Sequence, residues 1–435
     1  MGATIEIYRA GAWQPAAELV PTDNRAGYGS ACELDYRLDY AVDYAGPKTA
    51  AAAGLSCRYP ADFQQYRLDR WPPFILDILP SGYGRQQWLE QLELRDGPSA
   101  DWPLLLNGTA YPPGNLRVAE AVANKDTGTL VPTAAGDEVA MRDHPGFARC
   151  DVLAKSEAFT EYAYQHGIYA AGASDVQGVA PKILLAQDHR GVWHAEGRLD
   201  DHDVAAHWLV KRPRGNRSAD RKVLRNEAAY MAVAAQLGLR VHADLEWEED
   251  TLFVPRFDRA VRNGRVDRFG MESLCSAAGV AEYGARIAHE TLCDVILRYS
   301  SRAAEDLLEH VCRDVVNVVL GNTDNHARNT ALLRFEDGRV ELAPLFDFAP
   351  MYLDPEGIAR VCRWSGRTEQ AGHPDWRVVI ALFPDHAARL TERLRRFGRV
   401  LERLPETLRT CGVDDDIIEN RLHAIERHSK QLMEL

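Results

Sequence analysis

Three oxygen-bearing side chains around residue 330 have the types and the spacing that phosphoryl transfer requires. Asp324 precedes Asn329 by five residues, and Asp347 follows after two short apolar segments. Carboxylate and amide oxygens are hard ligands of the kind that Mg²⁺ prefers, and phosphoryl transfer also needs a base near the attacking hydroxyl. As a set, the three predict a catalytic Asp324–Asn329 pair, with Asn329 and Asp347 as the metal ligands. Asp324 or Asn329 alone would be interpreted as part of an ordinary polar loop.

A β-hairpin is predicted between Asn329 and Asp347. Residues 330–335 and 340–345 are largely apolar, and the Asp-Gly pair between them is the strongest short hairpin signal. A hairpin here brings its two ends together, so Asn329 and Asp347 are expected to converge beside Asp324. In the protein-kinase catalytic loop the base aspartate also stands five residues before a metal-binding asparagine.

A lysine and a glutamate upstream are predicted to form the phosphate-facing half of the site. Lys211 ends the apolar strand predicted over residues 207–211, and a helix is predicted from about Ser218 to Leu237. Glu227 shares the apolar face of that helix, where a buried carboxylate needs a partner. We therefore predict an ion pair between Lys211 and Glu227 of the kind that positions ATP phosphates in kinases.

A loop of small residues, 172–182, is a second candidate for contact with phosphate. Its glycines would let backbone amides approach ATP closely, which makes Gly178 and Val179 candidate nucleotide-binding residues. Ser174 in the same loop is a candidate phosphate contact or phosphorylation site, and a plain turn hydroxyl is the alternative. The loop matches neither a G-x-G-x-x-G pattern nor a Walker A loop.

Two further residues are assigned to the nucleotide site with an alternative left open. Arg256 lies on the strand predicted over 252–259, where a crossover between kinase lobes would line the adenine pocket; a structural ion pair with Asp258 is the favoured role. His326 is either a structural histidine of the catalytic loop or a contact to Asp347. It is not predicted to bind metal, since no second histidine stands at ligand spacing.

Composition limits the class of protein. The chain has 435 residues, room for two or three domains, and a net charge of −13, which disfavours direct binding of nucleic acid. No stretch reaches the roughly 20 apolar residues of a membrane span, and the N-terminus lacks the plan of a signal peptide. The eight cysteines contain no C-x-x-C pair, which favours reduced thiols in a cytoplasmic protein.

The order of these motifs resembles that of the HipA-type serine/threonine kinases of bacterial toxin–antitoxin systems. Five stretches carry the resemblance: 174–182, 209–211 with 226–227, 254–259, 323–329 and 342–347. The loop departs from the family pattern at Ala180, where Gln or Arg is usual, and the spacing from Ser174 to Lys182 is one residue longer.

The resemblance implies an α+β, two-lobed protein-kinase-like fold with an additional N-terminal β-rich subdomain and an all-helical C-terminal lobe. We expect the boundaries 1–120, 121–259 and 260–435. It also implies ATP and Mg²⁺ as cofactors, autophosphorylation at Ser174 and a HipB-like DNA-binding antitoxin as partner. The expected acceptor is a Ser or Thr of a protein, for which a translation factor is the family precedent. The alternatives are a small-molecule kinase on the same scaffold and a non-catalytic antitoxin-binding homologue.

Overall fold

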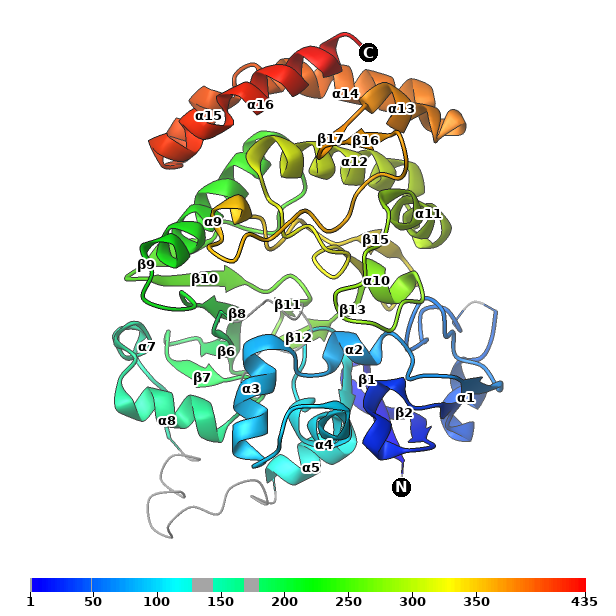
Figure 1. The fold of residues 1–435 in the computed structure, drawn as a ribbon. Helices are drawn as coiled ribbons and strands as arrows, with labels where there is room; N and C mark the ends of the chain where they lie inside the picture. The colour runs from blue at the N-terminus through cyan, green and yellow to red at the C-terminus, as the bar shows by residue number, and fades with distance from the viewer. Residues whose placement is uncertain (1, 48, 127–143, 168–179) are drawn as a thin grey trace. The chain divides into compact units, whose positions relative to one another are not determined.

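The computed structural model describes residues 2–47, 49–126, 144–167 and 180–435, which combine helices and sheets in the α+β class predicted (Figure 1). The chain divides into two compact units. Unit 1 comprises Met1–Arg212, Phe253–Gly284 and Leu332–Arg339, and unit 2 comprises Pro213–Leu252, Ala285–Ala331 and Val340–Leu435. The chain therefore passes between the units more than once, and both units draw on segments from either side of residue 259.

The N-terminal part of unit 1 is built on an antiparallel five-stranded sheet, as its alternating sequence predicts. Inward-facing Ile5 and Ile7 are buried while their neighbours are half-exposed, the period of two that one covered sheet face requires. Short helices cover this core. The strands, in sheet order, are β4 (Gln65–Leu68), β3 (Cys32–Tyr36), β2 (Ala12–Pro21), β1 (Ala3–Arg9) and β5 (Leu116–Val118), and the helices are α1 (Leu38–Tyr44), α2 (Ile75–Ile78), α3 (Gly82–Gln91), α4 (Pro98–Gly108) and α5 (Ala119–Asp126).

A second sheet in unit 1 carries Lys211 at the end of a central strand. Its hydrophobic core includes Trp193 and Phe253, both fully buried, and two helices pack on it. The elements are β7 (Trp193–Ala195), β6 (Lys182–Asp188), β8 (Val204–Lys211) and β10 (Thr251–Pro255), in that sheet order, with α7 (Arg149–Ala154) and α8 (Glu157–Gln165).

Both predicted hairpin turns are present. β11 (Arg259–Arg262) pairs with β12 (Arg265–Arg268) across Asn263 and Gly264, which both have positive φ, as a type I′ turn requires. The second hairpin joins β14 (Ala331–Arg334) to β15 (Val340–Leu342), neighbours in a sheet whose third strand is β13 (Gly270–Ser273), next to the short helix α10 (Leu274–Ala277). At its tip the Phe335 N–H donates to the Arg339 carbonyl.

Unit 2 is mostly helical, and a largely apolar helix, α12, lies at its centre. In Figure 1, α14 and α16 run side by side, and α12 packs against both. The lobe is not wholly helical, because two short strands form an antiparallel pair within it. The elements are α9 (Ser218–Gln236), β9 (Glu246–Glu248), α11 (His289–Tyr299), α12 (Ala303–Leu320), β16 (Glu369–Gln370), β17 (His373–Pro374), α13 (Trp376–Ala381), α14 (Ala387–Leu401), α15 (Leu404–Thr410) and α16 (Asp415–Met433).

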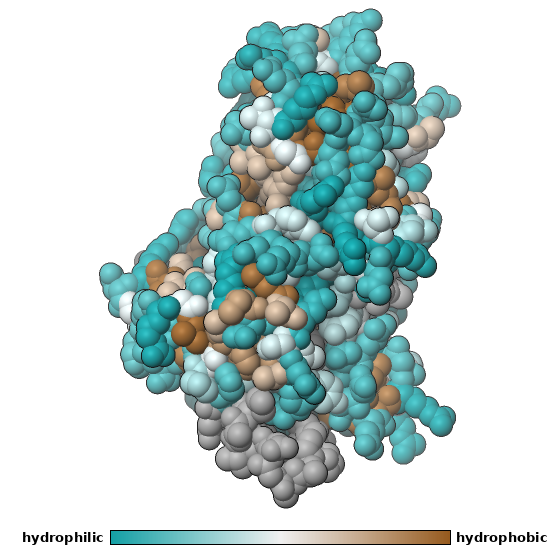
Figure 2. Space-filling model, turned by 90° about the vertical axis from the view of Figure 1, so that its left-hand side faces the viewer, coloured by the Kyte–Doolittle hydropathy of each residue, from teal (hydrophilic) through white to brown (hydrophobic). Residues whose placement is uncertain are grey.

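The surface visible in Figure 2 is mainly hydrophilic, with hydrophobic residues in patches between polar ones. Among the described residues, no helix combines the length and the apolar character needed to span a bilayer.

Candidate active site

The candidate site begins where α12 ends, at a position that only glycine fits. Gly321 has φ +75°, in the left-handed region that favours glycine, and a Cβ there would lie 2.7 Å from a ring carbon of Tyr352. The last carbonyls of α12 are bound by side chains: Arg421 donates to Val318 and Val319, and the Tyr230 hydroxyl donates to Leu320. This end of the helix is therefore fixed, and so is the start of the polar loop that follows.

Within the loop, Asn329 is bonded back onto the residue predicted as the base. Its side-chain amide donates to the main-chain carbonyl of Asp324 at 2.9 Å, and its own N–H donates to the His326 carbonyl at 2.9 Å. His326 is buried, and its Nε2 lies 3.7 Å from Asp324 Oδ1. The Asp324 carboxylate itself is 28% exposed, so it is open to an incoming molecule.

Asn329 and Asp347 line one small cavity. The cavity has a volume of about 20 Å³, room for a single water or ion. Asn329 Oδ1 is buried and has no hydrogen-bond partner among the described residues. Asp347 has φ +52°, an uncommon backbone conformation for a non-glycine residue that is often found at functional sites.

A buried polar cluster also contributes to the lining of this cavity. His289, His310 and Asp314 line it, with His289 Nδ1 3.2 Å from His310 Nε2 and His289 Nε2 3.1 Å from Asp314 Oδ1. Burial alone would raise the pKa of the Asp314 carboxyl, but the neighbouring Arg360 and His289 outweigh it and hold that pKa well below its usual value. Burial, with His289 beside it, lowers the pKa of His310 to about 3, so its ring is neutral at pH 7.

Lys211 and Glu227 occupy the elements predicted for them. Lys211 is the last residue of β8 in unit 1 and is 4% exposed; Glu227 lies on α9 in unit 2 and is 5% exposed. Both charges are thus buried, the condition under which each needs a partner. The ion pair between them stays a prediction.

Arg256 belongs to a buried ion network in unit 1, which includes the Asp258 partner expected from the sequence. Its guanidinium donates to both carboxylate oxygens of Asp258, and its Nη1 lies 3.2 Å from Glu196. Arg259 and His207 contact the same Glu196 carboxylate. The Arg256 side chain is only 4% exposed, so its N–H groups form hydrogen bonds in the interior of the unit.

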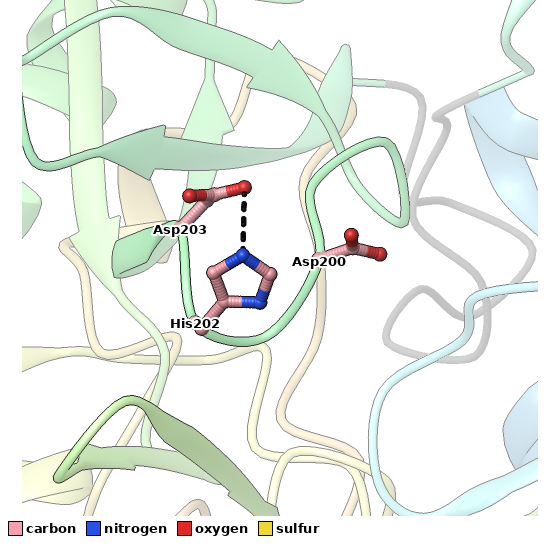
Figure 3. Close-up of side chains that lie close together, drawn as sticks. All are labelled: Asp200, His202 and Asp203. Carbon is pink, nitrogen blue, oxygen red and sulfur yellow. Dashed lines mark ion pairs between the residues drawn. The ribbon is translucent and has the colours of Figure 1, made fainter.

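Ser174, Gly178 and Val179 lie outside the described residues, and their roles stay predictions. The described part of the chain contains one cluster of three exposed potential metal ligands, Asp200, His202 and Asp203 (Figure 3). His202 and Asp203 are 3.5 Å apart, and all three lie in an exposed turn. Exposed acidic groups often cluster in this way without a metal.

The sequence interpretation missed the polar residues behind the loop. His310 and Asp314 stand four residues apart among the apolar residues of α12, a signal that could have marked a buried polar pair. Asn325 could not be distinguished by sequence from the other polar residues of the loop, although it forms hydrogen bonds with the distant Val361 and Cys362. Arg360 and Trp364 carried no signal, because their contacts to Asp314 span about fifty residues.

Similarity to known proteins covers most of the chain. Over its whole length the structure resembles HipA from Shewanella oneidensis MR-1, solved as a toxin–antitoxin complex of HipA, HipB and operator DNA, with a TM-score of 0.62, 17% identity, and coverage of 99% of this chain and 96% of that one. This likeness shows the fold. A curated relative from Sinorhizobium fredii (strain NBRC 101917 / NGR234), named "Putative kinase Y4mE", is 32% identical over 142 residues. That match covers 30% of this chain and only about a third of the relative's length, 33%.

The family model of the HipA-like C-terminal domain matches residues 174–410. That range exceeds half of the 435 residues and contains both the candidate loop and Asp347. The resemblance inferred from the motifs is thus confirmed, and the chain belongs to the HipA-like C-terminal domain family.

Proposed function

We propose that this chain is an ATP- and Mg²⁺-dependent kinase that transfers the γ-phosphate to a Ser or Thr hydroxyl of a protein in the cytoplasm. The observation that carries the proposal is the cavity lined by both Asn329 and Asp347, with Asn329 bonded to the main chain of Asp324. Membership of the HipA-like family and the kinase name of the curated relative support it.

The donor set suits a magnesium ion. Asn329 Oδ1 is a buried amide oxygen without a partner among the described residues, and Asp347 offers a carboxylate at the same cavity. Both are hard oxygen ligands, so these two residues would hold Mg²⁺. When bound, the ion supplies neutralisation of the charge that develops on the phosphates.

Asp324 is proposed to accept the proton of the attacking hydroxyl. Its carboxylate is partly exposed, while its main chain is held by Asn329, so the base is both reachable and fixed. Lys211 is proposed to contact the ATP phosphates, with Glu227 as its partner. The imidazole of His326 is buried in the loop beside Asp324.

Transfer of labelled γ-phosphate from ATP tests the reaction. The wild type with Mg²⁺ should phosphorylate protein acceptors in a lysate, and Asp324→Ala should lose transfer by about a hundredfold to ten-thousandfold, the usual contribution of a general base. Asp385→Ala, at an exposed aspartate of the same unit, is the matched control and should keep wild-type activity. Equal transfer by the wild type and Asp324→Ala would rule out the assignment of the base.

The class of acceptor is tested separately. Phosphoproteomics after brief induction should reveal Ser or Thr sites that appear with the wild type and not with Asp324→Ala. If labelled phosphate passes only into small molecules, the protein-kinase proposal is wrong and the small-molecule alternative holds. If the wild type turns over no ATP, the result supports the alternative of a non-catalytic, antitoxin-binding homologue.

Two further parts of the proposal rest on the family. Ser174 is proposed to be autophosphorylated; mass spectrometry should find phosphate there in the wild type and not in Asp324→Ala. A HipB-like DNA-binding antitoxin is proposed as partner, by analogy with the Shewanella complex. Affinity purification from the native host should recover such a protein, and recovery of this chain alone would contradict the proposal.

A further inference from the structure

The segment 360–364, which follows Asp347 along the chain, is bonded directly to the candidate catalytic loop by one side chain. Asn325 Oδ1 accepts the N–H groups of Val361 at 2.9 Å and Cys362 at 3.2 Å, and Asn325 Nδ2 donates to the Cys362 carbonyl at 2.9 Å. Asn325 is 8% exposed and stands next to Asp324 in the sequence. Its amide thus uses both its acceptor and its donor on the main chain of the segment.

The two ends of the segment, Arg360 and Trp364, are bonded to α12 through Asp314. Trp364 Nε1 donates to Asp314 Oδ2 at 2.8 Å, and the Arg360 guanidinium donates to Asp314 Oδ1. Arg360 also lies 2.6 Å from Glu369, so this single guanidinium joins two carboxylates. The Trp364 ring stacks on His289, with centroids 5.1 Å apart.

These contacts give the segment one strongly preferred position. Asp314 is 1% exposed, and moving the segment away would leave its carboxylate buried without Arg360 and Trp364. Breaking a buried ion pair by removing one partner is strongly destabilising, because a buried charge is left uncompensated. A rigid segment on one side of Asn325 limits where the neighbouring Asp324 can move.

We propose that Asn325 is a positioning residue that, together with Asp314 on α12, uses segment 360–364 as a clamp to fix the loop carrying Asp324. This inference rests on the proposed function and deepens it. Asn325 lines the same cavity as Asn329 and Asp347, but the side-chain hydrogen bonds described above run to the main chain of the segment, through which it acts. Misplacement of a catalytic group by about 1 Å can cost on the order of a hundredfold in rate.

The first test separates turnover from binding. Asn325→Ala should lower kcat by about tenfold to a hundredfold and leave KM for ATP within about twofold of wild type, since the base is misplaced while the phosphate and metal ligands remain. Asn325→Asp keeps the acceptor for both N–H groups and loses the donor. Its kcat should therefore lie between that of the wild type and that of Asn325→Ala. Asn124→Ala, which removes two side-chain hydrogen bonds from a half-buried asparagine in α5, should keep wild-type kcat.

A double-mutant cycle tests whether the contacts of Asn325 and of Asp314 act through the same segment. Trp364→Phe removes one donor to Asp314 and retains an aromatic ring beside His289, so it should fold and lower kcat by several-fold. If the clamp is one unit, the Asn325→Ala/Trp364→Phe protein should lose less than the product of the two single losses. A loss of kcat in the double variant equal to the product of the two single losses would contradict the proposal that both contacts act through one segment.

Hydrogen exchange distinguishes failure of the clamp from failure of the proposed function. The Val361 and Cys362 amides should exchange faster in Asn325→Ala than in the wild type or Asn124→Ala. Unchanged exchange overturns the clamp, as does faster exchange with unchanged kcat. If the wild type itself transfers no phosphate, the proposed function fails, and the exchange measurement still decides whether Asn325 holds the segment.

Discussion

Asn329 donates its side-chain amide to the main-chain carbonyl of Asp324 at 2.9 Å. The same side chain leaves Oδ1 buried, with no partner among the described residues, at the cavity that Asp347 also lines. One asparagine therefore couples the position of the proposed base to that of the proposed metal ligands. Replacing Asn329 would disturb the proposed base and the proposed metal site together, so substitutions at other residues separate the two effects better.

Replacement of Asp347 tests the proposed metal site. Asp347→Asn removes one anionic ligand and keeps the size of the side chain, so the affinity for Mg²⁺-ATP should fall about tenfold, or about 1.4 kcal/mol. Calorimetry with ATP in the presence and absence of Mg²⁺ measures this change. Asp385→Asn is the control, and an unchanged Mg²⁺-dependent affinity in Asp347→Asn would remove Asp347 from the site.

Lys211 is tested by a neutral side chain of similar length. Lys211→Met should raise KM for ATP on the order of tenfold, because the buried ammonium proposed to contact the phosphates is lost. Steady-state kinetics at several ATP concentrations provide the measurement. Lys430→Met, at an exposed position of α16, should behave as wild type. If both variants have the same KM, Lys211 does not bind the nucleotide.

Gly321 and Gly412 form a matched pair for the turn before the site. Both have positive φ, +75° and +82°, but a Cβ at Gly321 would meet Tyr352 at 2.7 Å, whereas a Cβ at Gly412 would meet nothing within 4 Å. Each alanine variant should lose roughly 1–2 kcal/mol from backbone strain. Gly321→Ala should lose about 1–3 kcal/mol more from the clash. Denaturant unfolding measures the difference, and equal losses would contradict the predicted clash.

A buried histidine in α16 should make stability depend on pH. His428 is fully buried, accepts a hydrogen bond from Trp376 Nε1, and burial lowers its pKa to about 4. The unfolded chain, with a pKa near 6.5, then binds more protons than the folded one between about pH 6.5 and 4. The free energy of unfolding should therefore fall as the pH drops through this window, by up to about 1.4 kcal/mol per pH unit from this group.

The measurement compares urea unfolding of the wild type and His428→Gln at several pH values from 7 to 4.5. The variant should show the smaller slope. His423→Gln, at an exposed position of the same helix, controls for the loss of a histidine. Identical slopes in the wild type and His428→Gln would contradict the assignment.

The local elements and the order of the motifs could be predicted from the amino-acid sequence. These features depend on residues that are neighbours in the sequence, whose spacing dictates the backbone geometry. They include the Asp-Gly and Asn-Gly turns, the helix that carries Glu227, and the five-residue interval from Asp324 to Asn329. The α+β class and the family followed from the same patterns. These features could be predicted because each is encoded within about twenty residues.

Which of these residues share a cavity, and what holds them there, depends on packing between segments that are distant in the sequence. The left-handed backbone of Asp347, the buried Oδ1 of Asn329 and the bonds from Asn325 to segment 360–364 arise from packing between distant segments. Contacts such as Arg360 to Asp314 join residues 46 positions apart, and no local period encodes them. They form because burying these charges is favourable only when each meets its partner.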